Sequence, residues 1–261
     1  MLTAYDYPLA ALVDEADIDI VLVGDSLANV VLGLESTREV TMEEMLHHAR
    51  AVNRAVKKAM LVGDMPYEAY QSHSESAVQN AKRFIKEAGC QAVKLEWFEK
   101  CLEVTSQIVQ SGIPVMGHVG LTPQTADRLG GFKVQGKDAN AALKLIEHAK
   151  DLERCGVFSI VLECIPEEIA RMITQELKIP TIGIGAGRHC DGQVLVTYDL
   201  LGFSSRFHPK FVKSYADLSP VILQAIRQYK KEVEENKFPD KEHSFSISEG
   251  ELKQLNRKGL N

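Results

Sequence analysis

Four carboxylic acids each follow a short apolar run directly, at the point where the run turns polar. The runs are IVLVGDS (20–26), MLVGD (60–64), AVKLE (92–96) and SIVLE (159–163), and the acids are Asp25, Asp64, Glu96 and Glu163. Such Val/Ile/Leu-rich runs without polar alternation predict parallel strands that are buried on both faces. Because the carboxyl ends of parallel barrel strands open onto one face, we expect the four acids to converge on one charged centre.

Several carboxylates at one centre suggest a particular kind of ion site. Carboxylate oxygens, together with backbone or water oxygens, are the ligands that Mg²⁺ prefers. The sequence has no cluster of Cys and His at metal-ligand spacing, which makes zinc a weaker candidate. Taken singly, each acid could instead cap the following helix or pair with an Arg or Lys.

Two further residues near these acids could bind an anion. Lys94 lies two residues before Glu96, so both side chains point to the same face, into the barrel. A buried Lys could bind a substrate carboxylate, form a Schiff base, or make an internal salt bridge with Glu96. The hydroxyl and amide of Ser26 could help to hold an anionic substrate, or could cap a turn.

Other candidates carry a weaker signal. His118 ends the strand-like run PVMGHV and is the histidine best placed for the site. The glycines of TIGIGAG (181–187) would let backbone amides approach an anion, and GGFKVQGKD (130–138) is typical of a loop over the barrel mouth. Cys164 could be a nucleophile, but a small buried side chain is the better interpretation, since no His neighbours it in sequence.

The elements that must position these residues alternate between strand and helix. Eight strands are predicted, at 2–4, 18–24, 60–64, 92–96, 114–119, 158–163, 181–184 and 193–197. Thr41 and Glu44 have capping-box spacing at the start of a helix over 41–59, and Gly89 is placed to end a helix over 74–89. This alternation predicts a (β/α)₈ barrel, with an open doubly wound sheet as the alternative. We expect one barrel domain over 1–261, with 236–261 a polar extension.

Composition limits the kinds of function. The net charge of −6 argues against a nucleic-acid surface, and no apolar stretch is long enough to span a membrane. The first residues lack the basic and apolar regions of a secretory signal. Five cysteines, an odd number without CxxC spacing, favour reduced thiols and a cytoplasmic location.

A series of motifs resembles one known enzyme family. In chain order they are VGDSL, GDMPY, VKLE, GHVGLTPQ, GGFKVQG, LECIP, IGIGAG, DGQVLV and HPKFVK. Together they resemble the 3-methyl-2-oxobutanoate hydroxymethyltransferase (ketopantoate hydroxymethyltransferase) family, over residues from about 2 to 245. The resemblance implies a (β/α)₈ barrel of the phosphoenolpyruvate/pyruvate type and a large homo-oligomer, commonly a decamer. It also implies transfer of a hydroxymethyl group from 5,10-methylenetetrahydrofolate to 3-methyl-2-oxobutanoate, through a Mg²⁺-stabilised enolate, in pantothenate synthesis.

The same resemblance implies a role for each candidate residue. Asp25, Asp64 and Glu96 match the family's magnesium ligands, with one ion per subunit. The keto-acid contacts match Asp25, Ser26, Asp64 and Lys94. Glu163 matches the proton acceptor, and His118 matches a pocket histidine.

Two departures and several alternatives accompany the resemblance. Family members usually carry a further stretch, including a helix, before the strand that begins here at Leu2. They generally have glycines where this chain has Trp97-Phe98, so we expect a reshaped rim on the folate side. The main alternative is a metal-dependent lyase or aldolase acting on a 2-oxo acid. A Schiff-base aldolase using Lys94 and a barrel that has lost activity are the others.

Overall fold

Eight parallel strands form one sheet in which each strand pairs with its neighbours in the chain. The computed structural model describes residues 1–71, 74–203 and 209–258, so His208, the first residue of the HPKFVK motif, lies outside the described part. The strands are β1 Leu2–Thr3, β2 Ile20–Val23, β3 Met60–Asp64, β4 Ala92–Lys94, β5 Val115–Gly120, β6 Ser159–Glu163, β7 Thr181–Ile184 and β8 Gly192–Gln193. Seven of them lie within the predicted strand ranges or match them to within a residue, whereas β8 shares only Gln193 with the strand predicted at 193–197, because Thr197 already begins α9.

The two edges of the sheet meet, which distinguishes a barrel from an open sheet. Leu2 forms a parallel bridge with Leu195, just beyond β8. The backbone N–H of Thr3 donates to the carbonyl of Leu195 at 3.3 Å, and the hydroxyl of Thr197 donates to the carbonyl of Thr3 at 2.5 Å. The predicted barrel is therefore confirmed, and the open doubly wound alternative is wrong.

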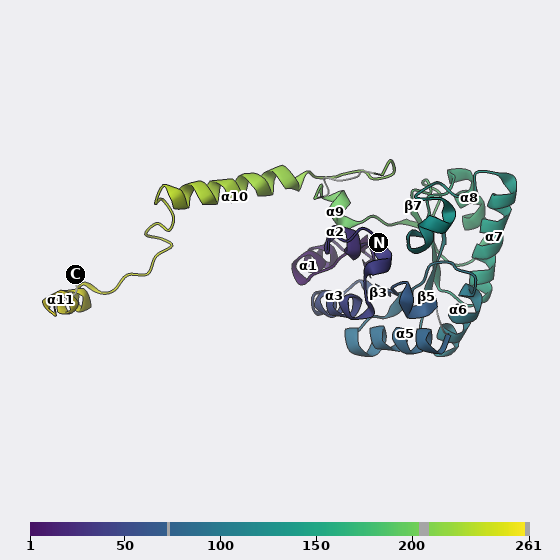
Figure 1. The fold of residues 1–261 in the computed structure, drawn as a ribbon, viewed down its shortest axis with the longest axis horizontal. Coiled ribbons are helices and arrows are strands. Elements are labelled where there is room, and N and C mark those ends of the chain that lie inside the picture. The colour runs from purple at the N-terminus through teal and green to yellow at the C-terminus, as the bar shows by residue number, and fades with distance from the viewer. Residues whose placement is uncertain (72–73, 204–208, 259–261) are drawn as a thin grey trace. The chain divides into compact units, whose positions relative to one another are not determined.

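Helices alternate with the strands and cover the outside of the sheet (Figure 1). The longer ones are α1 Tyr7–Glu15, α3 Met42–Ala55, α5 Ser74–Ala88, α6 Cys101–Gln110, α7 Ala139–Arg154 and α8 Glu167–Glu176. Shorter turns lie near the carboxyl ends of strands: α2 Leu27–Val30, α4 Glu68–Gln71, α9 Thr197–Leu200, and the 3₁₀ helices η1 Thr37–Glu39 and η2 Pro123–Leu129. The predicted capping box begins α3, where Thr41 and Glu44 each accept the other's backbone N–H.

The apolar strand residues divide between two hydrophobic layers. Alternate residues of a strand point to opposite faces, so Val21 and Val23 pack in the layer beneath the helices while Leu22 points into the barrel. One residue from each of six other strands or strand ends joins Leu22 inside: Val62, Ala92, Met116, Val161, Ile182 and Val194. This double burial explains why the strand sequences are apolar without alternation.

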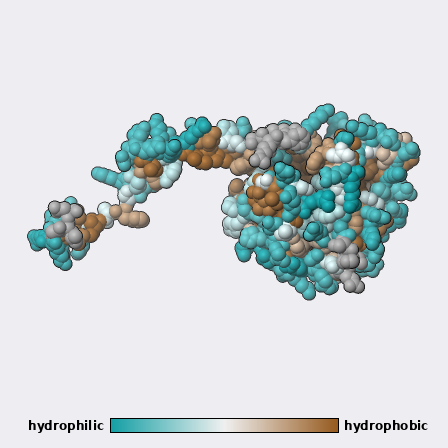
Figure 2. Space-filling view, viewed as in Figure 1, coloured by the Kyte–Doolittle hydropathy of each residue, from teal (hydrophilic) through white to brown (hydrophobic). Residues whose placement is uncertain are grey.

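The chain divides into two compact units, Met1–Tyr215 and Ala216–Asn261. The second contains α10 Leu218–Glu234 and α11 Glu249–Arg257, and α10 has no buried residue. Its apolar side chains include Val221, Ile226 and Tyr229, each about 60 % exposed, and brown surface gathers along this helix in Figure 2. A single domain over 1–261 with an extension from 236 stays a prediction. None of the helices within the described ranges is long and apolar enough to cross a membrane.

Candidate active site

The four strand-end acids come from strands β2, β3, β4 and β6, at the carboxyl end of the barrel. Asp64 and Glu163 are the last residues of β3 and β6, whereas Asp25 and Glu96 lie two residues beyond β2 and β4. Asp25, Asp64 and Glu96 are buried, and the backbone N–H of Asp25 donates to Oδ2 of Asp64 at 3.2 Å. Parallel pairing of neighbouring strands places these acids at one end of the barrel, as expected from the sequence.

Lys94 provides the positive charge within this acidic group. Its Nζ lies 2.8 Å from both carboxylate oxygens of Asp64, and both side chains are almost completely buried. Lys94 therefore does form an internal salt bridge, but with Asp64 and not with Glu96 as the sequence alternative had it. The reason is register, because Lys94 lies directly opposite Asp64 in the β3–β4 pair.

Gln124, which sequence reasoning missed, joins two of the acids. Its side-chain Nε2 donates to Oδ2 of Asp25 at 2.9 Å, and its backbone N–H donates to Oε2 of Glu96 at 3.0 Å. The side chain belongs to η2 and is fully buried. Gln124 is the last residue of the GHVGLTPQ motif, so the motif pointed to it. A neutral amide, however, does not by itself indicate a residue among carboxylates.

His118 lies between the other pair of acids. Its Nδ1 is 3.9 Å from Oε1 of Glu96, and its Nε2 is 3.4 Å from Oε2 of Glu163. Neither ring nitrogen has a hydrogen-bond partner, and neither does Glu96 Oε1. The His118 side chain is 1 % exposed, whereas that of Glu163 is 15 % exposed, so Glu163 is the member of this row that an incoming molecule can reach.

Ser26 lies at the edge of the group rather than among the acids. Its hydroxyl is hydrogen-bonded to the hydroxyl of Tyr5 at 2.8 Å, and it precedes the first turn of α2. Tyr5 is completely buried, and burial raises its pKa, so it remains a neutral phenol. Ser26 is thus held in place next to Asp25, with an oxygen that can still bind a second partner.

Burial dominates the ionisation of the site. The pKa of Asp25 is raised mainly by burial and secondly by the charge of Asp64. The pKa of Glu96 is raised mainly by burial and secondly by the charge of Asp25. Burial and the charge of Lys94 hold the pKa of His118 well below its usual range, so this imidazole is neutral. Burial lowers the pKa of Lys94, but Asp64, Asp25 and Glu96 together outweigh it and the net shift is upward. An ammonium held in this way is a poor nucleophile, which weighs against a Schiff base.

Glu163 has the ionisation expected of a general base. Burial raises its pKa to about 8, an effect opposed by Lys94 and reinforced by Asp25 and Asp64. A carboxylate whose pKa lies near the working pH is a stronger proton acceptor than an ordinary glutamate. Cys164 beside it is no rival, because burial raises the pKa of its thiol to about 12 and keeps it un-ionised at neutral pH.

The residues match a divalent cation in donor type and charge. Asp25, Asp64 and Glu96 supply only oxygen, and they share one cation, Lys94. Glu96 Oε1 is buried without a hydrogen-bond donor, and a bound cation would give this oxygen a partner. Within residues 1–71, 74–203 and 209–258, however, no group of three or more His, Cys, Asp or Glu is arranged to hold a metal ion. Binding would therefore need side-chain movement, above all of Asp64, both of whose oxygens contact Lys94.

We expect the free energy of unfolding of the metal-free protein to depend on pH because of these buried acids. Glu163 has a usual pKa of 4.5 and a raised value of about 8, so above about pH 4.5 the unfolded chain releases a proton that the folded protein keeps. The free energy of unfolding then falls as pH rises from about 5 to 8, by up to roughly 1.4 kcal/mol per pH unit for one such group. Urea unfolding with a chelator measures this, and Glu163→Gln should flatten the slope. An unchanged slope in that variant would contradict the raised pKa.

Gly120 allows the backbone of Glu163 to lie where it does. Gly120 pairs with Glu163 across β5 and β6, and the carbonyl of Glu163 accepts the N–H of Leu121 at 2.8 Å. A Cβ on Gly120 would overlap that carbonyl oxygen and lie 2.8 Å from Ile165 Cγ2. The φ of Gly120 is +102°, which an L side chain rarely adopts.

Replacing Gly120 should therefore destabilise the protein. For Gly120→Ala we expect a loss of about 2–4 kcal/mol in the free energy of unfolding, from the backbone clash and the strained φ. Gly33→Ala is the control, because its φ is +71° but nothing lies near its Cβ position. Denaturation curves compare the two, and equal losses would contradict the proposed clash.

Trp97 and Phe98 pack into the protein. The Trp97 indole stacks on His148 of α7 with 3.7 Å between ring centroids, and Phe98 is 8 % exposed against the ring of Tyr70. Phe98 thus packs against Tyr70, whose hydroxyl donates to Gln124 Oε1. Whether the pair reshapes a folate-side rim stays a prediction.

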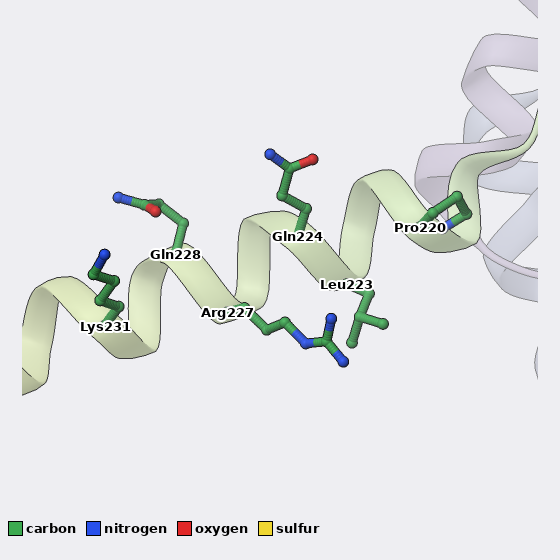
Figure 3. Close-up of a pocket in the computed structure, with 6 residues that line it drawn as sticks. All are labelled: Pro220, Leu223, Gln224, Arg227, Gln228 and Lys231. Carbon is green, nitrogen blue, oxygen red and sulfur yellow. The ribbon is translucent and has the colours of Figure 1, made fainter.

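A shallow hollow runs along α10, but it lacks the chemistry of the acidic group. Figure 3 shows its six lining residues on this one helix, with Leu223 and Arg227 on one side and Gln224 and Gln228 on the other. None of the six is a carboxylate, histidine or cysteine. The strand-end acids are thus the better candidate.

The fold and the acidic group define an α/β barrel whose candidate active site lies at the carboxyl ends of its strands. A solved structure of 2,3-dimethylmalate lyase, described as a PEP mutase/isocitrate lyase superfamily member, has a TM-score of 0.60. It covers 93 % of this chain and 82 % of its own, and at 14 % identity the likeness shows the fold alone.

Sequence comparison identifies the family. The ketopantoate hydroxymethyltransferase family model matches residues 1–241, and the chain belongs to this family. The 3-methyl-2-oxobutanoate hydroxymethyltransferase of Syntrophomonas wolfei is 56 % identical over 98 % of this chain and 92 % of its own length. That of Carboxydothermus hydrogenoformans is also 56 % identical, over 95 % of this chain and 90 % of its own.

Proposed function

We propose that this protein transfers a hydroxymethyl group from 5,10-methylenetetrahydrofolate to 3-methyl-2-oxobutanoate, which gives 2-dehydropantoate (ketopantoate). The observation that carries the proposal is the acidic group around Lys94, with the pKa of Glu163 raised, in a chain of this family. Relatives that are 56 % identical to it over the aligned residues bear the name of this activity.

The substrate is an anion with two neighbouring oxygen functions, and the site offers partners for both. Lys94 would bind the carboxylate of the keto acid, and Ser26 would donate its hydroxyl and orient the same group. Asp25, Asp64 and Glu96 would hold one Mg²⁺. When bound, this ion would supply Lewis-acid stabilisation of the negative charge that develops on the 2-keto oxygen.

Glu163 would then act as the base. Its carboxylate takes the C3 proton of the keto acid, and the electrons of the C3–H bond become those of an enolate. The C3 carbon of the enolate forms a bond to the methylene carbon of the folate as one of the two C–N bonds of the methylene bridge breaks, and the released nitrogen takes a proton. Water forms the new C–O bond as the second C–N bond breaks; the proton lost by that water goes to the second nitrogen, and tetrahydrofolate leaves. His118, whose Nε2 lies 3.4 Å from Oε2 of Glu163, is neutral and so would not neutralise that carboxylate.

The assembly and location belong to the same proposal. The family resemblance supports a homodecamer or another large homo-oligomer, which sedimentation of the full chain can test. The odd cysteine count supports a reducing, cytoplasmic environment, and all five cysteines are free thiols in the structure.

Product formation tests the activity directly. The full chain is incubated with 3-methyl-2-oxobutanoate and 5,10-methylenetetrahydrofolate, with Mg²⁺ or with a chelator. We expect ketopantoate only when the folate and the divalent ion are both present. Product without folate, or cleavage of a C–C bond in a 2-oxo acid, would favour the lyase alternative. Borohydride trapping of the keto acid on Lys94 would instead favour the Schiff-base reading.

A further inference from the structure

Gln124 is a buried polar side chain whose hydrogen-bonding groups are all engaged. Its Nε2 donates to Oδ2 of Asp25 at 2.9 Å and to the backbone carbonyl of Met65 at 3.0 Å. Its Oε1 accepts from the hydroxyl of Tyr70. Because a buried amide needs both kinds of partner, this set fixes which way the amide points.

The reversed orientation would be costly. Turning the amide over would place Oε1 against the Asp25 carboxylate and the Met65 carbonyl, two acceptors, and would remove Oε1 as the acceptor of the Tyr70 O–H. Tyr70 is 1 % exposed and its ring packs edge-on against Phe98, with centroids 5.3 Å apart. Burial raises the pKa of Tyr70, so its hydroxyl keeps the proton that it donates.

The backbone of Gln124 adds a second contact, on another strand. Its N–H donates to Oε2 of Glu96 at 3.0 Å and leaves Oε1 of Glu96 without a donor. One residue of η2 therefore contacts an acid that follows β2 and an acid that follows β4. It does so with neutral donors, so it adds no positive charge to a group in which Lys94 is the cation.

We propose that Gln124 is the positioning residue of the site and that Tyr70 acts through it. Gln124 holds the Asp25 carboxylate through its side chain and the Glu96 carboxylate through its backbone, and Tyr70 holds the amide oxygen so that Nε2 faces Asp25. This inference rests on the proposed function, because it assigns a purpose to two carboxylates whose role as ion ligands belongs to that proposal.

The test measures ion binding apart from catalysis. Mn²⁺ is titrated into the full chain, without substrate, and the dissociation constant is read from the free-ion paramagnetic signal. Gln124→Met keeps the length of the side chain and the backbone N–H that contacts Glu96, but removes the side-chain donor to Asp25. We expect binding weaker by roughly 10- to 100-fold, the usual effect of losing a partner behind an ion ligand. The KM for the keto acid should rise, and ion saturation should restore part of kcat.

Tyr70→Phe separates positioning from simple packing. It removes one hydroxyl and leaves the ring against Phe98, so we expect Mn²⁺ binding about 3- to 10-fold weaker, from an amide free to reorient. In the Gln124→Met background the same change should have almost no effect, because Tyr70 then has no amide to orient. Such a double-mutant cycle detects coupling that a general loss of stability would not produce.

Gln91→Met is the matched control. The Gln91 side-chain carbonyl accepts the N–H of Leu61 at 2.8 Å, near the amino end of β3, so the variant loses a glutamine contact outside the acidic group. Its Mn²⁺ affinity should equal that of the wild type. Unchanged affinity in Gln124→Met, or equal effects of Tyr70→Phe in both backgrounds, would overturn the positioning role. A wild-type chain that forms ketopantoate without binding a divalent ion would instead overturn the ligand assignment, and the positioning role with it.

Discussion

Glu163→Gln should slow exchange of the C3 proton of 3-methyl-2-oxobutanoate by roughly two to four decades, the usual range for the loss of a general base. The amide has nearly the shape of the carboxylate but cannot accept the proton. His118, whose Nε2 lies 3.4 Å from Glu163, cannot substitute, because its side chain is 1 % exposed and that of Glu163 is 15 % exposed. Keto-acid binding should change little, since Lys94 and the other acids remain.

The exchange measurement isolates this step from folate chemistry. Deuterium incorporation at C3 is followed by NMR in deuterated water, with keto acid and Mg²⁺ but without folate. Glu153→Gln is the control, because the Glu153 carboxylate accepts the N–H of Lys178 and takes no part in the acidic group. Exchange near the wild-type rate in Glu163→Gln would remove Glu163 from the role of base.

Asp64→Asn should have the second large effect, on the ion and on the keto acid together. Asp64 contacts Lys94 through both oxygens and accepts the N–H of Asp25, so its charge is shared between an internal cation and any divalent ion. Asparagine keeps the shape and one acceptor but loses the charge. We expect ion binding to weaken by at least about 100-fold, since even partners behind the ligands typically contribute 10- to 100-fold.

Keto-acid binding should weaken in parallel, because Lys94 loses the partner that holds its ammonium in place. Isothermal titration of Mg²⁺, and of keto acid at fixed Mg²⁺, measures both effects. Asp14→Asn is the control: Asp14 is also buried, but it accepts the backbone N–H groups of Lys57, Lys58 and Ala59. An identical Mg²⁺ titration in Asp64→Asn and wild type would show that Asp64 is not a ligand.

The sequence predicts the barrel well because the signal for it is local. Strands such as β2, β3 and β6 carry their own runs of apolar residues, and each run can be found without knowledge of the others. The acids at or just beyond the ends of β2, β3, β4 and β6 could be placed at one end for the same reason, because parallel pairing sends every strand end to the same face.

The contacts within the site could not be predicted in the same way. The pairing of Lys94 with Asp64 depends on strand register, which the apolar runs do not specify to a single residue. Gln124 contacts Asp25 across 99 positions of the chain, and only the closed fold brings them together. The sequence does not mark the division at Ala216 either, because the polar composition of the predicted extension begins only at 236.

The meeting of the first strand with the last has a consequence for how the protein assembles. Other strand pairs join segments that follow one another in the chain, whereas the hydrogen bonds between Thr3 and Thr197 join residues 194 positions apart. Closing so long a loop carries the largest entropic cost of any strand contact in the barrel. The seam is also short, since β1 and β8 are two residues each. The contact between β1 and the segment after β8 is therefore expected to form last, after the seven pairings of consecutive strands have brought the two edges of the sheet together.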